Sequence, residues 1–360
     1  MKNLSTLFAF ILLNFSFQAD AKEQTFELIR QPRTMAMGGA GVGLADDEFS
    51  LFHNAAGLAT QESRGFRPLQ LAVEGSWDTY TNLGDIMALT SNFSISNLDV
   101  FMNKDIAFRV NEVPMILLPH FALAYVYDTQ VVLNQYNKVN PNFNLGYMTT
   151  HGVQAGTAWT FKQGRHPTDE FRVGVTLKLL FRKGGFYDVG TAGLLQATGG
   201  GTAYLNSLVG NFGTGFGGDV GVQYSKKLTP TETISLGSSL IDVGDTRFSD
   251  THAMKIPMVW NLGLGYVKKL QEIKLSFALD MRNVTMATAL SNKIHFGGEA
   301  DFGMLSLQAG LNQLNPTYGL GFDAWIFKLM FLSYAEELGP SYHQLSSRRA
   351  MMQVNFNMPI

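Results

Sequence analysis

The chain has 360 residues, of which 46% are hydrophobic and 16% charged, with no cysteine and a formal net charge of −2. The lack of cysteine excludes disulfides and thiolate metal sites, and the absence of a basic excess argues against nucleic-acid binding. Beyond the N-terminus no continuous apolar run has the length of a membrane-spanning helix, so the apolar residues must be spread among polar ones.

The first residues have the pattern of a signal peptide. Lys2 precedes an apolar run from Leu7 to Phe17, and Ala19-Asp20-Ala21 fits an A-x-A cleavage site. That run is too short to cross a bilayer as a helix. We therefore predict a secreted protein with a signal peptide over residues 1–21 and a mature chain that begins at Lys22.

The mature chain opens with a segment, residues 22–68, that is rich in glycine and apolar residues but lacks a strand pattern. It includes the runs Arg33-Thr34-Met35-Ala36-Met37-Gly38-Gly39-Ala40, Ala45-Asp46-Asp47 and Phe52-His53-Asn54-Ala55-Ala56-Gly57-Leu58. Such a segment needs shelter, and we expect it to fold as a hatch within a barrel.

From Glu170 onward the chain alternates with a period of two residues. Phe171, Val173, Val175, Leu177, Leu179 and Phe181 fall on one face, opposite Arg172, Gly174, Thr176, Lys178 and Arg182, and Leu180 breaks the rule. Similar segments are 69–78, 105–112, 118–128, 151–162, 170–182, 216–226, 231–242, 257–268, 272–284, 291–302, 303–312, 316–324, 326–336 and 346–358. A strand with one apolar and one polar face, and about ten residues long, is typical of a membrane barrel.

We therefore predict an all-β fold, a transmembrane antiparallel β-barrel of about 14 strands (range 12–16) over residues 69–360, in the outer membrane of a Gram-negative cell. An even strand count places both termini on the periplasmic side, with short turns there and long loops outside. The predicted outer loops are 79–103, 129–150, 183–215 and 243–256.

The first and third of these loops are apolar, and both have room for short helices. Apolar loops either fold over the barrel mouth or contact a hydrophobic ligand or a partner protein. The candidate ligand or partner contacts are Leu89, Phe101, Leu194, Leu205 and Leu208. Many glycines fall on the polar, lumen face, among them Gly174, Gly237, Gly263, Gly265 and Gly310, where they either make room for a plug or ligand or ease strand curvature.

No sequence pattern clearly indicates a nucleotide site, a metal site or a catalytic site. Gly213, Gly215 and Gly218 have the spacing of a nucleotide loop but open a strand rather than a helix, and the seven histidines lack metal-ligand spacing. Lumenal solvation is the better explanation for His120, His151 and His295, and hydrogen bonding within the hatch for Asp46 to Glu48. His252 beside Asp250 and Thr251 is the one cluster that fits a hydrolase. We predict neither enzyme activity nor a cofactor.

The runs between residues 33 and 58, with Gly310-Leu311, Gly319-Leu320-Gly321-Phe322 and Tyr334-Ala335-Glu336-Glu337-Leu338-Gly339 near the C-terminus, resemble the FadL/TodX-like outer-membrane transport proteins and their PorV-like relatives. The resemblance implies a fourteen-stranded barrel, a lumen plugged by an N-terminal hatch, and a sideways route through the wall for hydrophobic compounds. The candidate hatch or gate residues that it implies are Arg33, Met35, Met37, Gly38, Gly39, Asp46, Asp47, Asn54, Ala55, Ala56 and Gly57. Asn54-Ala55-Ala56 stands where the family has Asn-Pro-Ala, which leaves that route open to question.

Two functions follow as expectations. The first is capture and passive uptake of hydrophobic small molecules of the fatty-acid or aromatic type. The alternative is a plugged, PorV-like scaffold that binds or anchors envelope or secreted proteins, or self-assembles, without transport. In either case the expected partners include the lipid and lipopolysaccharide of the outer membrane and the barrel assembly machinery, together with a hydrophobic small molecule or an envelope protein.

Overall fold

A computed structural model of the chain describes residues 27–62, 64–91, 102–135, 143–162, 168–190, 193, 196, 203–204, 206–339 and 343–359, without the side chains of 88–91, 162 and 359. The predicted signal peptide, residues 1–21, lies outside these ranges.

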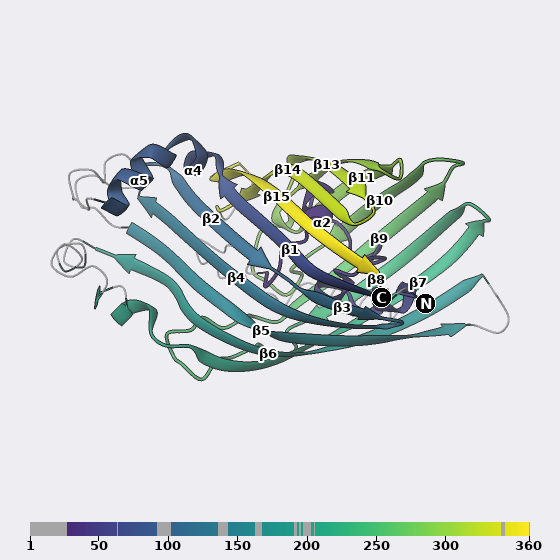
Figure 1. The fold of residues 1–360 in the computed structure, drawn as a ribbon, viewed down its shortest axis with the longest axis horizontal. Coiled ribbons are helices and arrows are strands. Elements are labelled where there is room, and N and C mark those ends of the chain that lie inside the picture. The colour runs from purple at the N-terminus through teal and green to yellow at the C-terminus, as the bar shows by residue number, and fades with distance from the viewer. Residues whose placement is uncertain are drawn as a thin grey trace, which may run out of the picture.

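Strands dominate the described residues and form one antiparallel sheet that closes on itself, because β1 (Gly65–Ser76) pairs with β15 (Ser346–Pro359). β2 (Asp105–Glu112) and β3 (Met115–Leu118) both pair with β1 on one side and with β4 (Phe121–Gln135) on the other, so they are two halves of one strand. The predicted closed barrel of fourteen strands is therefore confirmed (Figure 1).

The remaining elements follow in chain order. The strands are β5 (Phe143–Lys162), β6 (Asp169–Val189), β7 (Gly213–Thr229), β8 (Glu232–Ile241), β9 (Val259–Lys269), β10 (Lys274–Met281), β11 (Ile294–Asp301), β12 (Leu305–Asn312), β13 (Asn315–Ala324) and β14 (Phe327–Glu337). The helices are α2 (Pro32–Ala36), α3 (Ser50–His53), η1 (Ala55–Thr60), α4 (Trp77–Thr81), α5 (Leu83–Ser91) and η3 (Leu290–Asn292). None of the described helices combines the length and the hydropathy that a membrane crossing needs.

The period-two pattern separates the two faces of the wall as predicted. In β6, Leu177 on the outer face is 75% exposed, whereas Thr176 and Lys178 on the inner face are 3% and 4% exposed. Lys178 forms ion pairs inside the barrel with Asp219 at 2.7 Å and Asp242 at 3.0 Å. The outer face is thus apolar and uncovered, and most inward-facing residues are polar and paired.

The two ends of the barrel differ. At one end, here called the turn end, short joins connect β7–β8, β9–β10, β11–β12 and β13–β14, as predicted. The β3–β4 join also lies at this end, at residues 119–120, so the predicted gap at 113–117 is wrong, because β3 continues the strand to Leu118. At the other end, the loop end, the predicted bounds of loops 129–150 and 183–215 are partly wrong, because β4, β5 and β6 continue far into them (Figure 1).

The strand ends at the loop end carry outward apolar side chains that are covered instead of exposed. This cluster joins Ile86 of α5, Tyr204 and Leu208 to Ile106, Leu133, Phe143, Leu145, Tyr187 and Val189.

Residues 27–61, here called the inner segment, lie within the ring of strands. Its helix α2 contacts β12 to β15, whereas η1 contacts β4 to β7 on another arc of the same closed barrel. A short segment can reach both arcs only from inside. Figure 1 shows α2 behind the plane of β1 and β15. The segment is largely buried, and its buried residues include Met35, Ala36, Met37, Leu51 and Leu58.

Candidate functional site

The inner segment lies with its backbone directly against glycines of the barrel wall. An added Cβ atom at Gly174 of β6 would overlap Ala55, and one at Gly297 of β11 would overlap Met37. The wall glycines that approach the segment's backbone in this way are Gly174, Gly221, Gly237, Gly263, Gly265, Gly297 and Gly310, and Gly319 approaches the side chain of Ala36. Of the two sequence-based explanations for the lumenal glycines, making room for a segment inside the barrel is therefore the one that applies.

The side chain of Asn54 is buried and held by hydrogen bonds. Its side-chain amide donates to the carbonyl of Val42 at 2.9 Å and to that of Val222 at 3.3 Å, and its Oδ1 accepts the N–H of Ala56 at 3.2 Å. The side chain thereby fixes the turn that a proline would otherwise restrict. Asn54 and Ala55 lie flat on Gly221 and Gly174, and both residues are buried, at 0% and 1% exposure.

Arg33 joins the inner segment to the turn end of the barrel. Its guanidinium lies 2.6 Å from Asp46, 3.1 Å from Asp47 and 2.7 Å from Glu299 of β11, and Lys274 of β10 lies 2.8 Å from Asp46. Burial alone would raise the pKa of Asp46, but the charges of Arg33 and Lys274 outweigh it and hold that pKa well below its usual range. The arginine and both aspartates of the N-terminal motifs thus form one ion cluster.

Replacing Arg33 with glutamine should loosen this attachment. Three carboxylates would lose their shared cation, and we expect the free energy of unfolding in lipid bilayers to fall by about 2–3 kcal/mol. Denaturant titration measures the loss. Arg247 is the matched control, since it is 77% exposed and 3.8 Å from Asp245, so its replacement should cost at most about 0.5 kcal/mol. Equal losses in the two variants would contradict a holding role for Arg33.

Arg30 anchors the segment toward the loop end. It lies 2.7 Å from both Glu74 of β1 and Glu336 of β14, and donates to the hydroxyl of Tyr334 at 2.9 Å. Arg349 of β15 pairs with the same two glutamates, at 2.9 and 3.0 Å. All these groups are buried, so the network is strong only while every member is in place.

Wall side chains also hold the segment's backbone. Arg109 of β2 donates to the carbonyl of Leu28 at 3.0 Å, and Asp280 of β10 accepts the N–H groups of Gly41 at 2.6 Å and Val42 at 2.8 Å. His295 of β11 bonds to the carbonyl of Gly38 at 2.9 Å through Nδ1. Polar groups facing inward are therefore used to fix the segment rather than to line an open pore.

One arc of the inner wall is apolar instead. The inward side chains of β3, β4 and the neighbouring strands there form a cluster with the inner segment and with Ile256 of the β8–β9 loop (242–258). Its wall members are Val113, Met115, Leu117, Ala122, Ala124, Val126, Ala158 and Leu180, and its inner-segment members are Leu28, Ile29, Phe49, Leu51, Leu58 and Ala59. Leu180, the residue that breaks the alternation of β6, does so because it belongs to this apolar arc.

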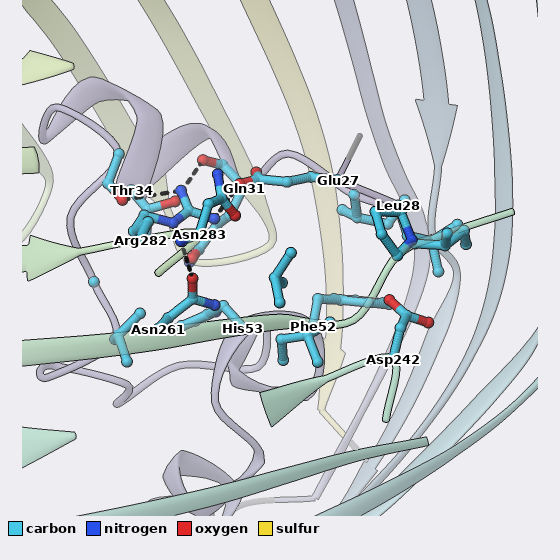
Figure 2. A pocket seen from close by; sticks show the side chains of 18 of the residues that line it. Glu27, Leu28, Gln31, Thr34, Phe52, His53, Asp242, Asn261, Arg282 and Asn283 are labelled. Atoms are coloured by element: carbon cyan, nitrogen blue, oxygen red, sulfur yellow. Dashed lines mark hydrogen bonds and ion pairs between the residues drawn. The ribbon is translucent and has the colours of Figure 1, made fainter. Parts of the chain in front are cut away.

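A cavity of about 50 Å³ lies between the inner segment and the β8–β9 loop. In Figure 2, Thr34, Arg282 and Asn283 gather on one side of it, while Leu28 and Phe52 lie toward the other. Asp242 lies on the same side as Leu28, so polar and apolar side chains mix around the cavity. Of its lining, Leu28, Ile29 and Ile256 belong to the same cluster as the inner wall of β3 and β4.

The wall has a weak seam beside this apolar arc, between β1 and the strand formed by β2 and β3. Arg67 pairs with Met115 and Leu71 with Glu112, so three β1 residues face two on the partner strand. The pairing of β1 with β15 shifts at the same place. A bulge of this kind removes ladder hydrogen bonds, and Pro68 and Pro114 have no N–H to donate.

The seam is closed on its inner side. Gln70 and Val113, which face inward there, are both 0% exposed. The backbone N–H of Gln70 donates to Oε1 of Glu112 at 3.1 Å instead of to a ladder carbonyl. The seam therefore has fewer backbone bonds than its neighbours and an apolar lining directly behind it. Sequence reasoning missed it, although two prolines in strand positions were the available signal.

The predicted ligand or partner contacts and the hatch glycines lie in different parts of the structure. Leu208 packs in the covered cluster at the loop end, and Leu89 lies in α5 without a described side chain. Phe101, Leu194 and Leu205 lie outside the described residues. Gly38 and Gly39 both have positive φ, at 72° and 80°, which allows the sharp path of the segment after α2. Gly57 packs against the backbone of Ala45.

Of the three histidines predicted to be solvated in the lumen, only His295 faces the lumen, where it is buried at 4% exposure and bonded to Gly38 rather than solvated. His120 is exposed in the β3–β4 turn, where φ is 59°. His151 faces outward in β5, with its ring stacked on Phe181 at 5.2 Å. The pair His252 and Asp250 is present, with Nδ1 at 3.0 Å from Oδ1, but it is a local contact on an exposed loop.

No family model and no curated protein matches the chain. Among solved structures it is similar to the CymD monoaromatic hydrocarbon channel, at 11% identity and a TM-score of 0.46 over 91% of this chain and 97% of that one. The Ralstonia pickettii toluene transporter TbuX gives 12% identity and a TM-score of 0.46 over 92% and 98%. The Pseudomonas putida toluene transporter TodX gives 10% identity and 0.40 over 94% and 98%.

Proposed function

We propose that the chain is an outer-membrane channel for the passive uptake of hydrophobic small molecules, with its turn end toward the periplasm. The uncovered apolar outer face suits contact with lipid and lipopolysaccharide, and the inward charges are paired, as a barrel in a bilayer requires. β1 begins and β15 ends at the turn end, so both chain ends belong to the periplasmic side in this orientation.

The observation that carries the proposal is the weak seam with an apolar surface behind it. A hydrophobic molecule gains free energy in proportion to the apolar area that it buries. The arc with Val113, Met115 and Leu117 is such an area inside the wall, and a ligand would reach it by taking the place of inner-segment side chains that now cover it. The small cavity beneath the β8–β9 loop lies on the approach from the loop end. Displacement of Leu28 or Phe52 would join the cavity to this arc.

A sideways exit fits the charges better than a straight passage. The inner segment acts as a plug, and a ligand moving along the barrel axis would meet the ion cluster of Arg33, Asp46 and Glu299 at the turn end. Passing a hydrophobic ligand through such a cluster would separate buried ion pairs at high cost. The seam leads instead into the bilayer, so only a few backbone bonds have to yield.

Uptake by intact Gram-negative cells tests the proposal. Cells that make the protein should take up radiolabelled toluene several-fold faster than cells that do not, because the lipopolysaccharide layer slows hydrophobic solutes. Uptake of a sugar, measured in the same cells, should not change because the lumen is plugged. Equal toluene uptake with and without the protein would refute the channel.

The alternative is a plugged scaffold without transport. It is favoured by the burial and hydrogen bonding of Asn54 and by the buried ion pairs that hold the inner segment. A scaffold predicts a protein partner recovered from membranes in a fixed ratio and no gain in toluene uptake. The uptake measurement therefore separates the two functions.

A further inference from the structure

Glu112 occupies an unusual place in the barrel wall. It is the last residue of β2, and its neighbours across the sheet are Leu71 of β1 and Tyr127 of β4. These neighbours and the next outward residues along β2, Val110 and Phe108, belong to the apolar outer face. Glu112 is thus a half-buried carboxyl group among lipid-facing side chains, directly at the seam.

A carboxylate facing hydrocarbon costs free energy, and ordinary ladder pairing would satisfy the N–H of Gln70 without it. The seam also contains polar side-chain atoms that form no hydrogen bond. In the described part of the chain, Oε2 of Glu112, both side-chain polar atoms of Gln70 and Nε of Arg67 are buried without a hydrogen-bond partner. Buried polar atoms without partners are rare in native proteins and call for an explanation.

We propose that Glu112 is a specificity-determining residue, which lets neutral hydrophobic molecules leave through the seam and turns back anionic amphiphiles such as fatty-acid anions. The inference rests on the proposed function, because it needs the seam to be the exit. A ligand leaving between β1 and β2 passes Glu112, where an anionic ligand adds like-charge repulsion to the cost of desolvating its own carboxylate. A neutral aromatic ring meets no such repulsion, and its positive edge is attracted to carboxylate oxygens.

The nearest cation on β1 does not cancel this effect. Arg67 pairs with Met115 on the turn-end side of the seam, and its Nη1 lies over Gly65. An anion attracted to Arg67 is drawn toward the turn end of the inner wall, away from the outward side where Glu112 stands. The two charges therefore act at different places along the exit.

Replacing Glu112 with glutamine separates charge from structure, because the amide oxygen can still accept the N–H of Gln70. We expect the ratio of laurate uptake to toluene uptake by intact cells to rise about tenfold in E112Q, with toluene uptake unchanged. Glu112→Asp keeps the charge and should keep the wild-type ratio. Glu272→Gln, in the exposed β9–β10 turn, is the matched control and should also leave the ratio unchanged.

The outcomes are distinguishable. An unchanged ratio in E112Q, in cells where toluene uptake still depends on the protein, would overturn the role of Glu112 and leave the channel intact. A raised ratio in E112D as well as E112Q would also overturn it, because charge would then not be the cause. Failure of the wild-type protein to increase uptake of either compound would instead refute the proposed function, and the inference with it.

Discussion

Replacing Gly297 with valine is expected to displace the inner segment and open the barrel to ions. A side chain at this position overlaps the backbone of Met37, which is buried to 1% exposure. Gly310, the cross-strand partner of Gly297, lies against the same part of the segment, so the segment cannot slide to the neighbouring strand. Overpacking of this kind costs about 3 kcal/mol, which the segment can escape only by leaving the wall.

Single-channel recording in planar bilayers measures the result. The wild-type barrel should conduct little, and the Gly297→Val variant should show the steady current of an open pore. Gly298→Val is the matched control, because Gly298 points outward and a Cβ there meets only the ring of Phe277 and the carbonyl of Ser276. A folded G297V barrel with wild-type conductance would mean that the inner segment does not close the lumen.

The barrel wall could be predicted from the sequence because its pattern is local. The alternation around Leu177 and Lys178 reflects which face of each strand meets lipid and which meets the interior, and this repeats in strand after strand. The ends of β4, β5 and β6 could not be found in this way. There Ile86 and Leu208 cover outward apolar residues, so the strands continue beyond the uncovered band.

The candidate site depended on contacts between distant parts of the chain. Arg33 stood out only through its motif, and its partner Glu299 is 266 residues away. Nothing in the local sequence marks Glu299 as that partner. Leu180 is different, because its break in the alternation was a visible signal of the apolar inner arc. Glu112, a lone carboxylate on an otherwise apolar face, was a signal of the same kind.

An engineered disulfide that cross-links the seam, here called a staple, is expected to abolish uptake of hydrophobic molecules. Phe66 of β1 and Ile116 of β3 are directly paired, and the natural chain has no cysteine, so a cysteine at each position gives one defined disulfide across the seam. Paired residues of antiparallel strands lie about 4.5–5.5 Å apart at Cα, within the range that a disulfide spans. The staple holds β1 against β3 without filling the inner apolar arc.

The matched control is a staple across an ordinary part of the wall. Leu264 of β9 and Leu279 of β10 are also directly paired, outward-facing and far from the seam, so their double-cysteine variant should transport normally in either redox state. This control separates closure of the seam from a general stiffening of the barrel.

The most direct test of the sideways exit is therefore the initial rate of toluene uptake by intact cells that carry the Phe66→Cys and Ile116→Cys variant, measured before and after reduction. The account predicts that the oxidised protein gives the rate of cells without the protein, and that reduction restores the wild-type rate. Full uptake by the oxidised protein, with the disulfide verified, would show that ligand does not leave between β1 and β3.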